Sequence, residues 1–429
     1  MDHHLPEQAR QGPRPLPLHL AVAMTIWLSS RAALPLARSG SLPWRRELQR
    51  NARALTRDLG GAEPSALDGA LEAEARRRLG AMLDGIEAYR VHPYRRSLAC
   101  PPVIWSEGAS RLYDYGTGCR GRRGPSPVLF VPSLVNRGYI LDLSERRSLL
   151  RYLAGRGVHP LLLEWGAPGD EERGFDFTDY VAGRLERALD AAVEIAGGPV
   201  SLVGYCMGGL MALALALRRP ADIDSLALLA TPWDFHAEHA AEARRLALLV
   251  GPLDHLASLP VDFLQALFAA LDPLLVPNKF RAFARLDPDT AAARDFVALE
   301  DWVNDGIALT GPVARGCFVG WYGANEPARG AWRIAGRAVR PEELKIPTLA
   351  IVPGRDRIVP PKGAMALGEA IPDAATIAVP LGHIGMIASA KAPEAVWRPL
   401  AAWLADGQLP GGKGRDGNPS PRNSTPMAA

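Results

Sequence analysis

Three residues that can form a nucleophilic triad follow one another along the chain in the order cysteine, aspartate, histidine. Cys206 stands in the segment LVGYCMGG, Asp356 follows the apolar run TLAIVP, and His383 follows the run TIAVP. A thiol next to an imidazole base that a carboxylate orients is suited to nucleophilic acyl transfer. We therefore interpret Cys206 as the nucleophile, His383 as the base and Asp356 as the residue that orients and stabilises the imidazole.

The residues around Cys206 predict a sharp turn between a strand and a helix. The segment SLVG is typical of a buried strand and MGGLMALALAL of a helix, so Tyr205 and Cys206 have to form the turn. This context is the nucleophile elbow, where Gly204 and Gly208 allow close approach of the backbone. The start of the helix favours a thiolate. We expect the backbone N–H of Met207 to form half of an oxyanion hole.

Six short apolar runs separated mostly by helical stretches have to position these residues. Uninterrupted runs of this length are typical of parallel strands buried on both faces. The pattern predicts an α/β fold with a mostly parallel central sheet and helices on both faces. Nucleophile, acid and histidine each follow a predicted strand, which is the order of the α/β-hydrolase fold. The six runs are VLFVP, PLLLEW, VSLVG, LALLA, TLAIVP and TIAVP.

The remaining segments predict additions to this domain. Residues 1–97 are expected to form a helical amino-terminal extension, and residues 98–405 the catalytic domain, which begins with a hairpin over 103–116. Residues of about 234–340 interrupt the strand–helix rhythm and predict a helical cap over the carboxyl edge of the sheet. Residues 406–429 are rich in Gly, Pro, Ser and Asn, which predicts a disordered tail.

Composition excludes several classes of function. The chain has 429 residues, with 49 Lys and Arg against 46 Asp and Glu in interspersed order, so it carries no electrostatic signature of nucleic-acid binding. Four cysteines in a chain of this length do not form a disulfide framework and suit a reducing cytoplasm. We expect structural or incidental thiols at all of them except Cys206. The other three are Cys100, Cys119 and Cys317.

Two further segments allow alternative interpretations. His236 and His239 lie one helical turn apart, but no third ligand stands out, so we expect a surface pair and no metal site. The segment HLAVAMTIWL, residues 19–28, follows basic residues like a signal peptide but lacks a clean cleavage site, and its apolar run is too short to span a bilayer. It is either a surface-seeking helix on an apolar phase or a helix packed on the domain.

Several motifs together resemble the polyhydroxyalkanoate synthases over roughly residues 90 to 405. The motifs are VLFVPSLVNRGYILDL, GYCMGG, ATPWDF, VNDG, PGRDRIVP and LGHIGMI. The resemblance implies an acyltransferase that polymerises 3-hydroxyacyl-CoA, of short chain, through an acyl-cysteine on Cys206 with release of CoA. It implies that the backbone near Ser133 and Leu134 supplies the second oxyanion donor. It also implies a cytoplasmic enzyme without a cofactor, which adds to a growing polyester chain at a granule surface, with a homodimer or a second synthase subunit possible.

The sequence departs from the family pattern at two places, and it allows two alternative functions. Arg357 stands where these synthases often have histidine, and VPSLVN replaces a Pro-Pro-Trp start. The same triad would serve a cysteine-nucleophile hydrolase, either an intracellular polyester depolymerase or an acyl-CoA thioesterase. A non-catalytic granule protein is the third interpretation, against which the complete set of Cys206, Asp356 and His383 counts. VNDG, residues 303–306, is explained equally well by substrate contact and by packing.

Overall fold

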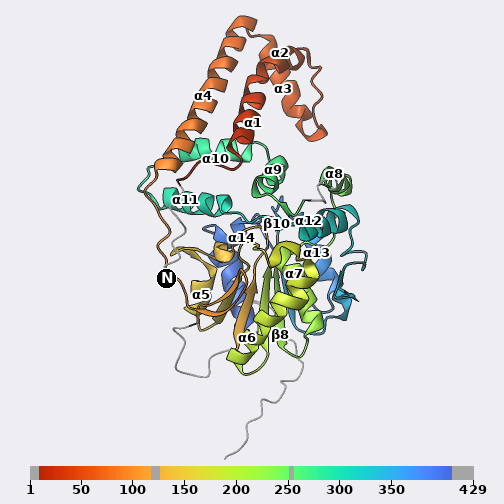
Figure 1. Ribbon diagram of the computed structural model, residues 1–429. Helices are drawn as coiled ribbons and strands as arrows, with labels where there is room; N and C mark the ends of the chain where they lie inside the picture. The colour runs from red at the N-terminus through yellow and green to blue at the C-terminus, as the bar shows by residue number, and fades with distance from the viewer. Residues whose placement is uncertain (1–8, 117–125, 251–255, 408–429) are drawn as a thin grey trace, which may run out of the picture.

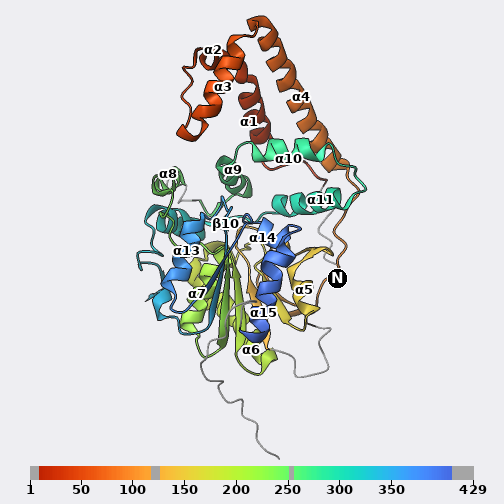
Figure 2. The same ribbon diagram turned by 180° about the vertical axis from the view of Figure 1, so that it is seen from behind.

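A computed structural model describes residues 9–116, 126–250 and 256–407 of the chain (Figures 1 and 2). Its centre is a sheet of eight strands in the order β1-β2-β6-β3-β7-β8-β13-β14. Six of these strands are parallel and coincide with the six predicted runs, so the predicted α/β-hydrolase architecture is confirmed. They are β3 (Pro127–Val131), β6 (His159–Glu164), β7 (Val200–Tyr205), β8 (Ile223–Leu229), β13 (Thr348–Pro353) and β14 (Ala375–Val379).

Two helical layers cover the sheet because its strands are apolar on both faces. Alternate residues of β3 enter separate cores, Leu129 and Val131 on one face, Val128 and Phe130 on the other. The first face is covered by α6 (Glu186–Ala196), α7 (Met207–Arg218) and α13 (Pro361–Ala370). The second is covered by α5 (Leu149–Ala154), α14 (Gly385–Ala388) and α15 (Arg398–Asp406).

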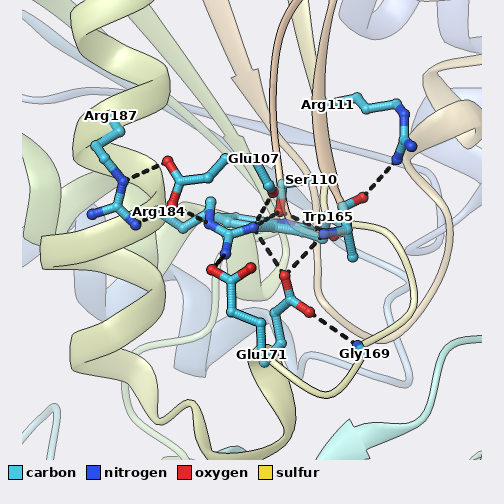
Figure 3. A network of polar contacts seen from close by, with 10 residues as sticks. Glu107, Ser110, Arg111, Trp165, Gly169, Glu171, Arg184 and Arg187 are labelled. Atoms are coloured by element: carbon cyan, nitrogen blue, oxygen red, sulfur yellow. Dashed lines mark hydrogen bonds and ion pairs between the residues drawn. The ribbon is translucent and has the colours of Figure 1, made fainter.

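The predicted hairpin forms one edge of the sheet, as β1 (Val103–Glu107) and β2 (Ser110–Asp114). Strand β2 pairs antiparallel with β6. A buried cation holds the turn of this hairpin: Arg184, from the π-helix η5 (Asp179–Leu185), contacts three carboxylates (Figure 3). The ion pairs measure 3.2 Å to Glu107, 2.6 Å to Glu171 and 3.0 Å to Glu172. This network ties the hairpin to the loop that follows β6.

The residues between β8 and β13 are mostly helical and lie over the carboxyl edge of the sheet (Figure 1). We call this segment the cap. Its helices are α8 (Ala240–Val250), α9 (Val261–Leu271), α10 (Leu275–Phe283), α11 (Ala291–Asn304), α12 (Gly311–Arg315) and the π-helix η7 (Gly316–Gly323). Short strands pair within it, β9 (Ser258–Leu259) with β10 (Leu309–Thr310) and β11 (Arg333–Ile334) with β12 (Arg337–Ala338). The cap thus faces the edge from which the triad residues emerge.

Four helices before the hairpin stand on the far side of the cap from the sheet (Figures 1 and 2). They are α1 (Leu16–Leu28), α2 (Ser30–Ser39), α3 (Gln49–Gly60) and α4 (Pro64–Val91), and we call them the extension. Helix α1 packs through Ala23 and Trp27 into a core shared with α4 and α10, so it is a helix packed on the protein. Outside this core, the side chains of Met24, Ile26 and Leu28 are between 37% and 46% exposed.

The apolar segment is longer than the sequence suggested. Only a turn at Ser29 separates α1 from α2, and within the 24-residue helical segment Leu16–Ser39 an 18-residue window has a mean hydropathy of 1.4. By length and composition alone this longer segment could cross a membrane, although the uninterrupted apolar run within it is the short one that the sequence showed. The predicted disordered tail lies almost wholly outside the described residues, and Cys119 lies outside them too.

Candidate active site

Cys206 occupies the sharp turn between β7 and α7. Its backbone has φ 56° and ψ −126°, a region that side-chain-bearing residues rarely adopt and that costs about 1–3 kcal/mol. The turn is held from both sides, since the N–H of Cys206 donates to the carbonyl of Leu229 at 2.9 Å and its carbonyl accepts from the N–H of Gly209 at 2.9 Å. The strained turn presents the half-buried sulfur at the carboxyl edge of the sheet.

Three glycines make this turn sterically possible. A Cβ on Gly204 would lie 2.4 Å from the Cα of Gly209. A Cβ on Gly208 would lie 2.1 Å from the carbonyl oxygen of Val131, and one on Gly209 would lie 1.9 Å from Oγ1 of Thr231. The first two positions are those the sequence singled out, and Gly209 is a third. Close approach of α7 to the neighbouring strands therefore requires glycine at all three.

The structure brings Cys206, His383 and Asp356 together. Nδ1 of His383 lies 2.6 Å from Oδ2 of Asp356, and the imidazole is hydrogen-bonded to the Cys206 side chain. The other carboxylate oxygen of Asp356 accepts from the backbone N–H groups of Ile358 and Val359, at 2.8 and 2.9 Å. Asp356 and His383 are both buried. The carboxylate is thus fixed in place and holds one imidazole nitrogen while the ring faces the sulfur.

The charges in the site favour a protonated histidine. Burial alone would lower the pKa of His383, but the charge of Cys206 and the charge and hydrogen bond of Asp356 raise it to about 10. The hydroxyl of Tyr205 donates to the carbonyl of His383 at 3.2 Å, which ties the elbow to the loop that carries the histidine. The site therefore holds an imidazolium next to the nucleophilic sulfur and can donate a proton to a leaving group.

The cap contributes an apolar wall next to Cys206 that the sequence did not reveal. Buried Cys317 and half-buried Tyr322, both of η7, lie close enough to Cys206 for its charge to add to desolvation in raising the pKa of both. The ring of Phe235 lies 4.9 Å from that of Tyr322. His236 is bonded through Nε2 to the carbonyl of Tyr322 at 2.8 Å. Neither an elbow nor a motif marks Cys317 or Tyr322, so no sequence signal identified them.

The loop after β3, residues 132–139, which we call the β3 loop, lies against the start of α7. A Cβ on Gly208 would lie 2.1 Å from the carbonyl oxygen of Val131 and 2.5 Å from that of Pro132, so the two segments pack closely there. Ser133 and Leu134 come next in the chain, with Leu134 buried. Met207 is the first residue of α7, where N–H groups have no partner within the helix. The predicted oxyanion donors therefore belong to two segments that meet at the elbow.

Two other residues singled out by the sequence lie elsewhere. His239 is exposed and, among the described residues, no group of three or more His, Cys, Asp or Glu side chains is placed to hold a metal ion. Arg357, next to the triad aspartate, forms an ion pair with Asp272 at the end of α9. This residue thus links the Asp356 loop to the cap.

Comparison with known proteins agrees with this geometry. Residues 126–389 match the family model described as alpha/beta hydrolase fold. The chain is 31% identical over 300 residues to the poly(3-hydroxyalkanoate) polymerase subunit PhaC of Synechocystis sp., covering 66% of this chain and 79% of the relative. The chain belongs to the poly(3-hydroxyalkanoate) polymerase family. A second PhaC polymerase subunit, from Allochromatium vinosum, is 30% identical, covering 70% of this chain and 87% of the relative.

Solved structures match at lower similarity. The monoacylglycerol lipase of Paleococcus ferrophilus has 20% identity and a TM-score of 0.43, with 68% of this chain and 97% of the lipase covered. The resemblance to the synthases implied a triad of Cys206, Asp356 and His383. In the structure His383 interacts with both of the other two residues.

Proposed function

We propose that this chain is a polyhydroxyalkanoate synthase, an acyltransferase that polymerises short-chain 3-hydroxyacyl-CoA into polyester and releases CoA. The observation that carries the proposal is the contact of Cys206 with His383 and of His383 with Asp356 at a strained elbow, in a chain whose relatives are named polymerase subunits. A thioester substrate and a cysteine nucleophile fit one another, because exchange between two thioesters loses little free energy.

In the first step the sulfur of Cys206 attacks the carbonyl carbon of the acyl-CoA. The carbonyl oxygen becomes negative and accepts hydrogen bonds from the N–H of Met207 and from the β3 loop near Ser133 and Leu134. When the tetrahedral intermediate collapses, the bond to the CoA sulfur breaks, and the imidazolium of His383 gives its proton to that sulfur. The products are free CoA and an acyl-Cys206 thioester.

In the second step the hydroxyl of another hydroxyacyl unit attacks the acyl-Cys206 carbonyl. Neutral His383 takes the hydroxyl proton as the carbon–oxygen bond forms, and the sulfur of Cys206 leaves as a thiolate. An ester bond has replaced the thioester, and the thiolate faces an imidazolium again. Every proton and charge in the two steps is handled by these residues and by backbone N–H groups, so we propose no cofactor.

The cap wall supports both the transferase reaction and the short acyl chain. Buried Cys317 and half-buried Tyr322 lie close to Cys206, and Phe235 packs on Tyr322. An apolar lining excludes water, which would otherwise compete with the hydroxyl of the incoming unit. We expect the same rigid aromatic side chains to favour a short acyl substituent next to the sulfur.

We further propose a cytoplasmic enzyme that works at the surface of its polyester granule. The exposed apolar side chains of α1, Met24, Ile26 and Leu28, support contact with an apolar phase. The three cysteines within the described residues are unpaired, as expected in a reducing compartment. These relatives are named polymerase subunits, which supports a partner, either a second copy or a second synthase subunit. Light scattering of the purified chain, alone and with a candidate subunit, tests this.

The experiment that tests the function incubates purified protein with 3-hydroxybutyryl-CoA next to the variant Cys206→Ala. Released CoA is followed with a thiol reagent, and insoluble polymer is separated from free 3-hydroxybutyrate. Polymer that depends on Cys206 is the expected result. Free acid that depends on Cys206 would instead identify a hydrolase, and CoA release by Cys206→Ala at the wild-type rate would refute the assigned nucleophile.

A further inference from the structure

We infer that the end of α11 clamps the β3 loop in the position that forms the oxyanion hole, with Asp305 and Arg137 as positioning residues. The inference rests on the proposed function, because it concerns the loop that would supply the second oxyanion donor. Its starting point is the VNDG segment, residues 303–306, whose role the sequence left open between substrate contact and packing.

Backbone and side-chain hydrogen bonds join this segment and the residues on either side of it, Trp302 and Ile307, to three consecutive residues of the β3 loop. The N–H of Ile307 donates to the carbonyl of Val135 at 2.9 Å, and Asn136 forms an isolated antiparallel bridge with Gly306. The indole N–H of Trp302 donates to the carbonyl of Arg137 at 2.8 Å. The conformation of the loop is therefore set by the cap as well as by the sheet.

Charged groups reinforce the same contact. Arg137 lies between two carboxylates, 3.7 Å from Asp305 and 3.6 Å from Glu164. Tyr139 lies close enough to Asp305 to oppose the rise in the pKa of that carboxyl, and Glu164 accepts from the N–H of Gly138 at 2.8 Å. Burial raises the pKa of the carboxyl groups of Glu164 and Asp305, because it disfavours their charged form. Without these partners the two charged groups would be costly to bury. Asp305 thus binds two side chains of the β3 loop from the cap side.

The proposed donors lie between two fixed points. On one side Val131 and Pro132 pack against Gly208 in the first turn of α7. On the other side the loop from Val135 to Tyr139 is bound to the end of α11. Ser133 and Leu134 lie between these anchors, so release of the α11 anchor would let both move. Because removal of one oxyanion donor costs on the order of 10²- to 10³-fold in rate, a small displacement is enough to slow acyl transfer.

The same turn of α11 is bound from its other side by the extension. Asp301, one helical turn before Asp305, accepts from Arg10 at 2.6 Å and from the hydroxyl of Tyr89 at 2.8 Å. The side-chain oxygen of Asn304 accepts from the N–H of Arg14 at 3.1 Å. The end of α11 is therefore the link through which the extension reaches the β3 loop.

The test separates carbonyl chemistry from reactivity of the sulfur in the variant Asp305→Asn. Acylation of Cys206 is measured as the p-nitrophenol burst from p-nitrophenyl butyrate, and alkylation of Cys206 as its reaction with iodoacetamide. Alkylation forms no oxyanion, so it needs the nucleophile but not the hole. We expect acylation to slow by about 10- to 100-fold and alkylation to stay within about twofold of wild type.

A matched control lies on the same helix. Asp295 of α11 forms an ion pair with Arg147 at 2.8 Å, away from the β3 loop, so Asp295→Asn should acylate at the wild-type rate. Asp305→Glu keeps the charge and should recover part of the rate. Wild-type acylation in Asp305→Asn, or equal loss of acylation and alkylation, would overturn the inference.

Two further measurements test the link to the extension and separate the inference from the synthase proposal. Asp301→Asn is expected to slow acylation selectively as well, and an unchanged rate would overturn the link to the extension. The p-nitrophenyl ester requires no polymerisation. A protein that releases free 3-hydroxybutyrate in place of polymer from 3-hydroxybutyryl-CoA but shows the selective loss in Asp305→Asn would therefore refute the synthase proposal and support the clamp.

Discussion

Gly208→Ala should disable the elbow without touching any triad side chain. The new Cβ would lie 2.1 Å from the carbonyl oxygen of Val131 and 2.5 Å from that of Pro132. Both are backbone atoms at the end of β3, all of whose residues are buried in the centre of the sheet, so they cannot move aside. The first turn of α7 has to move instead, and it carries Met207 and follows Cys206 directly.

The size of the shift follows from the same distances. To bring the Val131 contact from 2.1 Å to an ordinary separation, the helix start must retreat by about 1.5 Å. A misplacement of about 1 Å can cost on the order of 100-fold in rate. Overpacking of this kind also destabilises a protein by about 1–3 kcal/mol. We therefore expect acylation to fall by about 100-fold in protein that is still folded but less stable.

The p-nitrophenyl butyrate burst measures acylation, and urea unfolding measures the loss of stability. Gly69→Ala is the matched control, since a Cβ there has nothing within 4 Å, and Gly69 lies within helix α4. That variant should keep its rate and gain about 0.5–1 kcal/mol, because alanine favours the helix. A Gly208→Ala enzyme with the rate and stability of the wild type would refute the elbow geometry.

Three more outcomes follow from the site and from the hairpin network. Cys206→Ala should lower the pKa of His383 from about 10, because burial opposes protonation and the charge of Cys206 favours it; an NMR titration of the ring that finds no change would contradict this. In folded protein at neutral pH, iodoacetamide should modify Cys206 and spare Cys317, because burial raises the pKa of the Cys317 thiol. Peptide mass mapping would show which of the two cysteines is modified. Arg184→Met should cost about 3–5 kcal/mol by urea unfolding, because three carboxylates lose a buried cation. Arg187→Ala removes a half-exposed cation and should cost less than about 1 kcal/mol.

The parallel sheet could be predicted because burial on both faces leaves a direct trace in the sequence. Every residue of β3 and of β13 is buried, so each appears as an uninterrupted apolar run. Parallel strands end at a common edge, so the residues that follow them are brought together by topology alone. For that reason Cys206, Asp356 and His383 could be chosen before any distance was known.

The contacts of the cap could not be predicted, because they depend on how a long insertion packs back on the sheet. Tyr322 and Cys317 lie on a π-helix, which has no simple sequence period, and they reach Cys206 from far along the chain. The ion pair of Asp305 with Arg137 joins a single charged residue of the cap to a single charged residue of the β3 loop. Single ionisable residues have no periodicity, so only the fold shows that VNDG contacts the β3 loop.

The apolar segment at the amino terminus was ambiguous for a related physical reason. Helix α1 is apolar around its whole circumference, a pattern typical of a helix surrounded by other apolar groups. In this chain only one face has such neighbours, through Ala23 and Trp27, while Met24, Ile26 and Leu28 remain open. A second apolar phase on the open face would satisfy the pattern. Because the extension also binds the end of α11, a surface that holds the extension would act on the same helix that positions the β3 loop.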